Sequence, residues 1–255
     1  MRDLQLSCLI DGCSYSAKQL DGVQYRRHVH ALHTLMRLGA VVNRRGQPLS
    51  HDAIDRLLPE DAREVSIATR QAYGPDGLKE LYRDQLLESD KMWRAANDAA
   101  ADAPLLLAQT DITVVGVSLE DLSKVVGLNA IHHVYAALHP DHDFAIGDET
   151  CLEHMETFGH FGGPTWLFAH PDKSISVPVE RDEEYPMLMA GHTTLASDGT
   201  PMNLYAYHQF KPLENGFAIK QCAAFPPNTP LPIVDGHKLH LAIEIWEAAK
   251  LAAKN

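Results

Sequence analysis

Apolar residues recur at helical spacing through the first hundred residues of the chain. Leu32, Leu35 and Met36 form one such stripe in the segment 25–38. The pattern predicts three helices, at residues 25–38, 51–58 and 77–103. Pro59 and Pro104 are expected to end the second and the third helix. We therefore predict a helical N-terminal region over residues 1–105.

The pattern changes after this region to short β-branched or alternating segments. Strands are predicted at residues 112–117, 165–168, 174–179, 202–210 and 216–225. Asp198-Gly199 and Asn215-Gly216 are typical hairpin turns. A proline-rich loop then leads to a closing helix from Leu239 to Ala253. Strands followed by a long helix predict an α+β fold in one domain, 106–255, whose sheet wraps around that helix.

Composition and charge narrow the class of ligand. The chain has 255 residues, 45% of them hydrophobic, and a formal charge of −12. Such acidity argues against nucleic acid as a partner and favours a neutral, cationic or metal-chelated ligand. We find no membrane-spanning run or signal peptide, and the four cysteines are too few for a disulfide scaffold, so a cytoplasmic protein with reduced thiols is expected.

Clustered histidines and carboxylates predict a metal site. His240 and Glu244 are four residues apart, which places them on one face of the closing helix. Two upstream clusters, His139-Pro-Asp-His142 and Glu153-His154-Met-Glu156, would complete a set of four ligands. Two imidazoles and two carboxylates suit Zn²⁺, and also Fe²⁺ or Mn²⁺. His139 remains an alternative to His142, as Glu153 and His154 do to Glu156.

The order of these motifs resembles the diacetylphloroglucinol hydrolase family, which includes phloretin hydrolase. The resemblance runs from about Gly116 to the C-terminus. It rests on Gly116-Val-Ser-Leu-Glu-Asp-Leu, on Tyr135 followed by Pro140-Asp-His142, on Glu156-Thr-Phe-Gly159, on Tyr207-His208 and on the final His240 and Glu244. The fold that it implies is the helix-grip (Bet v 1/START-like) architecture, a curved antiparallel sheet around a long C-terminal helix.

The same resemblance implies a reaction. The metal ligands would be His142, Glu156, His240 and Glu244, with His208 and Tyr135 as the catalytic residues that handle protons and orient the substrate. The expected activity is zinc-dependent hydrolysis of a carbon–carbon bond between an acyl group and a phenolic or polyketide-like ring. The partner would be a small aromatic ketone. The N-terminal helices are expected either to cover the cavity or to form a homodimer interface.

Two other functions fit the sequence. One is a non-catalytic helix-grip carrier of a hydrophobic small molecule, in which the histidines bind no metal. The other is an adaptor built on a zinc finger of Cys8, Cys13, His28 and His33. The spacing from Cys13 to His28 exceeds the usual twelve residues by two, which favours two buried thiols beside a helix with surface histidines.

Overall fold

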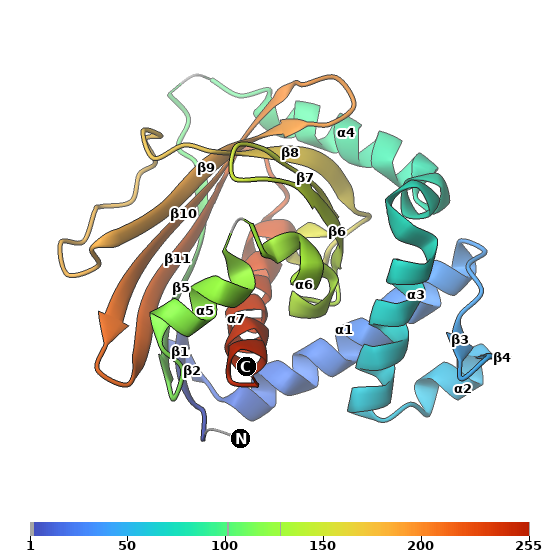
Figure 1. Ribbon diagram of the computed structural model, residues 1–255. Coiled ribbons are helices and arrows are strands. Elements are labelled where there is room, and N and C mark those ends of the chain that lie inside the picture. Colours follow the sequence, from blue (N-terminus) through green and yellow to red (C-terminus); the bar gives the residue numbers. More distant parts are fainter. Residues whose placement is uncertain (1–2, 101, 128, 255) are drawn as a thin grey trace.

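A computed structural model describes residues 3–100, 102–127 and 129–254 of the chain, and nine of its strands form a single antiparallel sheet (Figure 1). In sheet order these strands are β2 (Cys13–Tyr15), β1 (Gln5–Ile10), β5 (Leu106–Val115), β11 (Gly216–Phe225), β10 (Pro201–Leu213), β9 (Met187–Leu195), β8 (Thr165–Pro171), β7 (Leu152–Glu156) and β6 (His142–Gly147). The strands β3 (Asn43–Arg44) and β4 (Gln47–Pro48) form a separate small hairpin.

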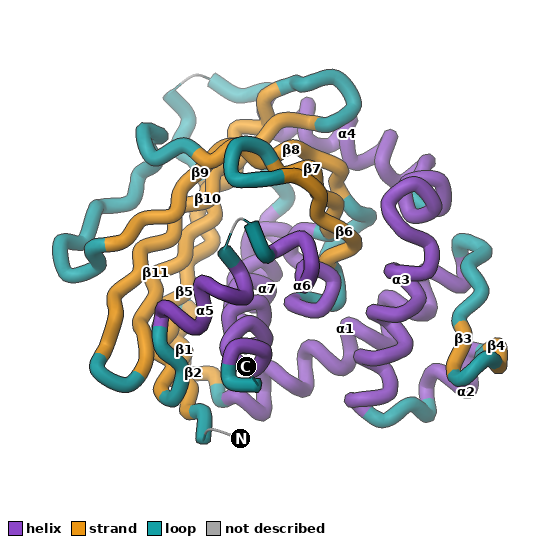
Figure 2. The backbone as a smooth tube through the Cα atoms, in the orientation of Figure 1, coloured by secondary structure: helices purple, strands orange, loops and turns teal. Residues whose placement is uncertain are grey.

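The helices divide into two groups around this sheet (Figure 2). They are α1 (Ala17–Arg37), α2 (His51–Asp55), α3 (Pro59–Leu81), α4 (Arg83–Asn97), α5 (Leu119–Val126), α6 (Ile131–Leu138), the 3₁₀ turn η1 (Phe158–His160) and α7 (Leu231–Ala252). The sheet curves around α7, with α5 and α6 beside it, while α1, α3 and α4 gather on one side. The described part of the chain contains no helix that is long and apolar enough to cross a membrane.

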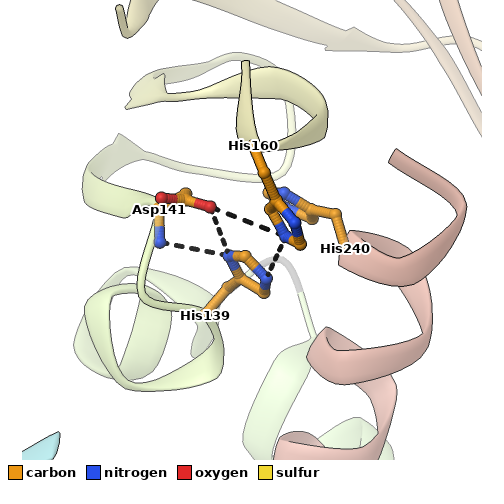
Figure 3. A group of neighbouring side chains, drawn as sticks. All are labelled: His139, Asp141, His160 and His240. Atoms are coloured by element: carbon orange, nitrogen blue, oxygen red, sulfur yellow. Dashed lines mark hydrogen bonds and ion pairs between the residues drawn. The ribbon is translucent and has the colours of Figure 1, made fainter. Parts of the chain in front are cut away.

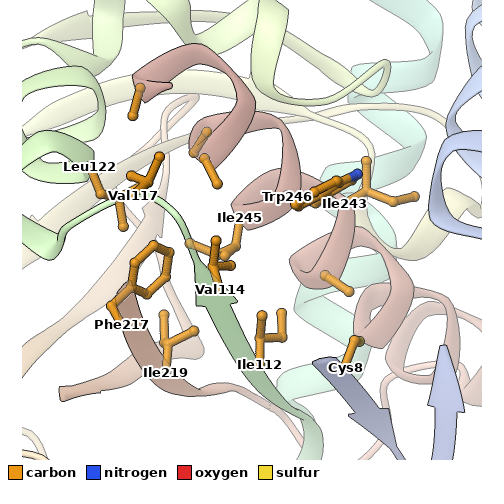
Figure 4. Packing of buried hydrophobic residues seen from close by; sticks show 14 of the residues in the cluster. Cys8, Ile112, Val114, Val117, Leu122, Phe217, Ile219, Ile243, Ile245 and Trp246 are labelled. Atoms are coloured by element: carbon orange, nitrogen blue, oxygen red, sulfur yellow. The ribbon is translucent and has the colours of Figure 1, made fainter. Parts of the chain in front are cut away.

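The main core lies between α7 and the strands β1, β5 and β11 (Figure 4). Val114 and Phe217 from the sheet are fully buried, and they belong to the same cluster as Ile243 and Trp246 from the helix. Burial of each large apolar side chain contributes about 1.5–3 kcal/mol to stability. This contact fixes α7 inside the curve of the sheet, so polar residues on its other faces have defined positions.

The predicted α+β class, with a sheet packed against a long C-terminal helix, is confirmed. Strands form at four of the five predicted places, and Asn215-Gly216 turns from β10 into β11 as predicted. Asp198-Gly199 also lies in a hairpin turn, but it joins β10 to β9, a strand that was not predicted. The closing helix begins eight residues earlier than predicted, at Leu231. Pro232 lies in its first turn, where a missing backbone N–H leaves no helical hydrogen bond unmade.

The prediction of a strand at 174–179 is wrong. This segment is a loop between β8 and β9, and Ile175, Val177 and Val179 pack against a cluster on the sheet that includes Tyr207. Its alternation therefore reflects the packing of a loop on a surface rather than pairing within a ladder. Pro178 could not donate to a ladder in any case.

Pro59 does not end a helix but begins one. It occupies the first turn of α3, a helix that the sequence did not reveal between residues 59 and 73. Gly74, with a φ of 62°, and Pro75 interrupt α3, so the predicted start near Gly77 matches only its last part. The region 1–105 also supplies β1 and β2 to the sheet, and β1 pairs directly with β5.

Candidate metal centre

Three buried side chains from three elements meet inside the curve of the sheet. His142 begins β6 and Glu156 ends β7, and the two residues are partners across this strand pair. Paired residues project their side chains from the same face of a sheet. His240 comes from α7, which the apolar core holds against that face. The antiparallel pairing of β6 with β7 is therefore what brings an imidazole and a carboxylate of distant sequence position together.

The distances within this group fit a metal ion. The Nε2 atoms of His142 and His240 are 2.8 Å apart, and Glu156 Oε2 lies 3.1 Å from the first and 3.6 Å from the second. In a tetrahedral zinc site with bonds of about 2.0–2.2 Å, neighbouring ligand atoms are about 3.3 Å apart. We refer to His142, Glu156 and His240 as the central group.

A hydrogen bond at one ring nitrogen of His142 turns the other ring nitrogen towards Glu156 and His240. Nδ1 of His142 lies 3.1 Å from the carbonyl oxygen of Tyr135. A carbonyl can only accept, so Nδ1 carries a proton, and Nε2 is the ring nitrogen that faces Glu156 and His240. Metal-binding histidines are commonly oriented by such a bond from the other ring nitrogen.

The charges of the central group also suit a cation. Burial lowers the pKa of His142, but the adjacent Glu156 carboxylate outweighs burial and leaves that pKa above its ordinary value. Burial raises the pKa of Glu156, whereas its hydrogen bond with His142 holds it well below the usual range. Burial, with His237 and His142 nearby, lowers the pKa of His240 well below its usual value. Two imidazoles beside an ionised carboxylate are the donor set of many divalent metal sites.

Tyr135 supports the group from α6. Its hydroxyl donates a hydrogen bond of 2.8 Å to Glu156 Oε2, and its ring stacks on the ring of His142 at a centroid distance of 4.0 Å. Burial, followed by the charge of Glu156, raises the pKa of this phenol well above its ordinary value. Tyr135 therefore stays protonated and orients a carboxylate oxygen, which makes it a positioning residue in this structure.

The remaining predicted residues lie on the cavity wall. Glu244 is one helical turn beyond His240, but its carboxylate is outside the compact central group among the described residues. Burial raises its pKa. His208 lies on β10, where Nδ1 accepts the backbone N–H of Cys222 at 3.3 Å, and burial lowers the pKa of His208 to about 4. This bond leaves the proton of His208 on Nε2.

Two adjoining cavities connect these residues. The inner one, of about 160 Å³, is lined by the central group together with Tyr135 and Glu244. The outer one, of about 180 Å³, has a mainly apolar wall that includes Phe210, Ile245 and the partly exposed Met189. Both cavities share His208 and Glu244 in their walls. An elongated molecule with an apolar end and a polar end would fit this arrangement.

The structure separates the alternatives that the sequence left open. His154 lies 3.9 Å from Glu156 but outside the central group, and Glu153 points to Lys79 and Trp166. His139 belongs instead to a neighbouring group with Asp141, His160 and His240.

Sequence reasoning missed His237, which also lines the inner cavity. It stands three residues before His240, so the spacing His-x-x-His-x-x-x-Glu on one helix face was the signal for it. The sequence offered His139 as an alternative to His142 and placed Asp141 in the same cluster, but it did not indicate His160.

The zinc finger finds no support in the described residues, because Cys8, Cys13, His28 and His33 do not converge on one point there. Cys8 is buried in the sheet and Cys13 is exposed. Burial raises the pKa of the Cys8 thiol to about 11, which disfavours the thiolate that zinc requires.

Neither the protein-family models nor the curated proteins with which the chain was compared give a match. The central group and the cavities beside it are therefore the features that indicate a function.

Proposed function

We propose that this protein is a metal-dependent hydrolase that cleaves the carbon–carbon bond between an acyl group and a phenolic or polyketide-like ring. The observation that carries the proposal is the central group, which supplies two imidazoles and one carboxylate at the end of a largely apolar cavity. Three protein ligands with an open position are typical of catalytic zinc, whereas structural zinc is usually closed by four. The antiparallel sheet around α7 agrees with the helix-grip architecture that the family resemblance implies.

In this reaction the oxygen of a water molecule bonds to the carbonyl carbon, and the bond from that carbon to the ring breaks. The ring carbon takes up a proton, so that the products are a carboxylic acid and the deacylated ring. A bound zinc ion would supply polarisation of a ketone oxygen and acidification of water. His142, Glu156 and His240 would hold it, and Tyr135 would keep Glu156 in position.

His208 acts in this proposal as a hydrogen-bond donor to the substrate. Its Nδ1 already accepts the N–H of Cys222, so Nε2–H is free to donate to a phenolic or ketone oxygen. With a pKa of about 4, this imidazole stays neutral at pH 7. His208 therefore orients the polar end of the substrate rather than delivering a proton from an imidazolium.

Glu244 has two roles open to it, as fourth ligand or as the group that takes a proton from water. Burial raises its pKa, which makes the carboxylate a better acceptor for a proton from water. The variant Glu244→Gln separates the two roles. Unchanged zinc affinity with lost turnover assigns proton transfer, whereas a large loss of affinity assigns coordination.

The proposed function is tested by incubating the protein with a panel of acylphloroglucinols. The quantity measured is the carboxylic acid that hydrolysis releases. We expect turnover with zinc, loss of turnover after chelation and its return when zinc is added. His142→Ala should be inactive, and His51→Ala, at an exposed site on α2 outside both cavities, should remain active. Ligand binding that is unchanged by chelation, with no hydrolysis by a zinc-loaded protein, would support the carrier function instead.

A further inference from the structure

A second group of metal-ligating side chains lies beside the central group (Figure 3). It consists of His139, Asp141, His160 and His240, and one donor atom from each lies within 4.8 Å of the others. His139 and Asp141 come from the turn between α6 and β6, His160 ends η1, and His240 lies on α7. His160 is partly buried and the other three side chains are buried.

The distances in this group resemble those of the central group. The Nε2 atoms of His139 and His160 are 3.3 Å apart. Asp141 Oδ2 lies 3.6 Å from His160 Nε2 and 3.7 Å from His139 Nδ1. A tetrahedral zinc site separates its ligand atoms by about 3.3 Å. Nδ1 of His139 accepts the backbone N–H of Asp141 at 3.1 Å, so the proton of this ring lies on Nε2, beside His160 Nε2. A cation shared by the two rings at these Nε2 atoms would therefore displace that proton.

An unpartnered ring nitrogen of His240 also points to a cation in this group. Nε2 of His240 lies 2.8 Å from Nε2 of His142, and the ring of His240 stacks on the ring of His139 at a centroid distance of 3.8 Å. Nδ1 of His240 is buried and has no hydrogen-bond partner among the described residues. Buried polar atoms are seldom left without a partner, so a ligand at this point would satisfy an otherwise costly atom.

The Asp141 carboxylate can still bind a metal cation although it also accepts hydrogen bonds from Arg27. Arg27 donates to Oδ2 from Nε at 3.0 Å and to Oδ1 from a terminal nitrogen at 2.5 Å. An ionised carboxylate has about four acceptor positions, so these two bonds leave Oδ2 with a free lone pair. The guanidinium offsets the carboxylate charge, and an imidazole-rich donor set suits Zn²⁺, Cu²⁺ or Ni²⁺ better than Mg²⁺ or Ca²⁺.

We propose that His139, Asp141, His160 and Nδ1 of His240 form a second site for a borderline divalent cation such as zinc, with His240 as the imidazole between two ions. When both sites are filled, His240 gives its remaining ring proton to solvent. The second site does not depend on the hydrolase reaction, because its existence follows from the side chains around His240 alone.

Zinc stoichiometry tests this proposal. Purified full-length protein, stripped by a chelator and titrated with zinc in calorimetry, should bind two equivalents. His160→Asn should bind one, because asparagine tolerates the positive φ of 62° at this position but is a poor zinc ligand. His139→Gln should behave in the same way. Glu156→Gln should weaken the first equivalent and keep the second, with folding of each variant checked by circular dichroism.

A matched control variant shows whether the second zinc equivalent binds adventitiously at the protein surface. Nδ1 of His33 and Nδ1 of the exposed His51 are 2.6 Å apart on α1 and α2, which makes this pair a plausible place for stray zinc. His51→Ala should leave two equivalents. A second equivalent that disappears in His51→Ala, or a single equivalent in the wild type that His160→Asn leaves unchanged, would overturn the second site without affecting the proposed hydrolase function.

Discussion

Glu156 is the residue on which the central group depends most. It faces both imidazoles, and it accepts the hydrogen bond of Tyr135. Glu156→Gln removes the negative charge while keeping the shape, so we expect zinc affinity to fall by more than about 100-fold. Tyr135→Phe keeps the charge and removes one orienting hydrogen bond, for which a loss of about 10–100-fold is typical. Competition with a chromogenic chelator measures both values, and equal affinities for Glu156→Gln and wild type would remove Glu156 from the ligand set.

The buried His208 is expected to make the free energy of unfolding depend on pH. Its pKa is about 4 in the folded protein, because burial disfavours the charged ring, and 6.5 is its ordinary value. Between these values the unfolded chain binds more protons than the folded one, so the contribution of His208 to stability is complete above pH 6.5 and is lost as pH falls to 4. The difference corresponds to at most about 3 kcal/mol.

His208→Gln should therefore flatten the pH dependence, since a glutamine oxygen can still accept the N–H of Cys222 but does not titrate. Urea unfolding of the metal-free protein at pH 7, 6, 5 and 4 measures the slope, with exposed His51→Gln as the matched control. Identical slopes in His208→Gln and wild type would show that His208 is not buried as a neutral ring.

At the scale of single residues, the sequence indicated His142, Glu156 and His240 because motif order and helical spacing are local information. It named His142 as a ligand but left His139 as an alternative, since the two residues are only three positions apart, around the start of the same strand. The choice depends on the pairing of His142 with Glu156, which joins β6 to β7 and is invisible in either segment alone.

The position of α7 relative to η1 is set by two glycines in contact. A Cβ atom on Gly236 would lie 1.8 Å from the carbonyl oxygen of Gly159, and a Cβ atom on Gly159 would lie 2.0 Å from the carbonyl oxygen of Ile233. Side chains cannot fit at either position without movement of the helix. The Glu156-x-x-Gly159 motif thus has a structural reason: it places a ligand at the end of β7 and lets α7 approach closely.

Gly236→Ala is expected to displace α7, which carries His240. We predict a loss of about 2 kcal/mol or more in the free energy of unfolding, as for other overpacked buried sites, and a lower zinc affinity. Gly22→Ala in α1 is the matched control, because its Cβ would meet only a flexible arginine end at 3.7 Å. That variant should be neutral or stabilised by up to about 1 kcal/mol. Chemical denaturation and zinc titration of both variants would show whether the glycine contact positions the ligand.

Helix ends and turns that depend on neighbouring residues could be predicted from the sequence, whereas strands that depend on distant contacts could not. The hairpins and Ser118, which caps α5 by accepting the N–H of Asp121 at 3.0 Å, were predictable from short motifs. The sheet strands β1, β2, β6, β7 and β9 were not predicted, because polar and small residues obscure their alternation. Asp11-Gly12, between β1 and β2, is a hairpin signal of the same local kind, whereas the pairing of β1 with β5 comes from tertiary contacts.

The whole molecule is joined across the predicted boundary at residue 105. The buried Arg70 of α3 donates to the carbonyl oxygens of Ala136, His139 and His142, which form the turn that leads into the central group. An unpaired guanidinium or carbonyl left in this interior would cost free energy, so α3 and the metal-binding segment stabilise each other. We therefore expect the N-terminal helices and the sheet to unfold together.

Three tryptophans make this last prediction measurable. Trp93 lies on α4, Trp166 on β8 and Trp246 on α7, so fluorine-labelled tryptophan gives one NMR signal from each part of the fold. We predict that the three signals are lost at the same denaturant concentration. Zinc at about 100 times its dissociation constant should stabilise the folded state by about 2.7 kcal/mol and shift all three midpoints equally. An earlier midpoint for Trp93 alone, unmoved by zinc, would instead mean that the helical region folds as a separate unit and that Arg70 does not couple it to the metal centre.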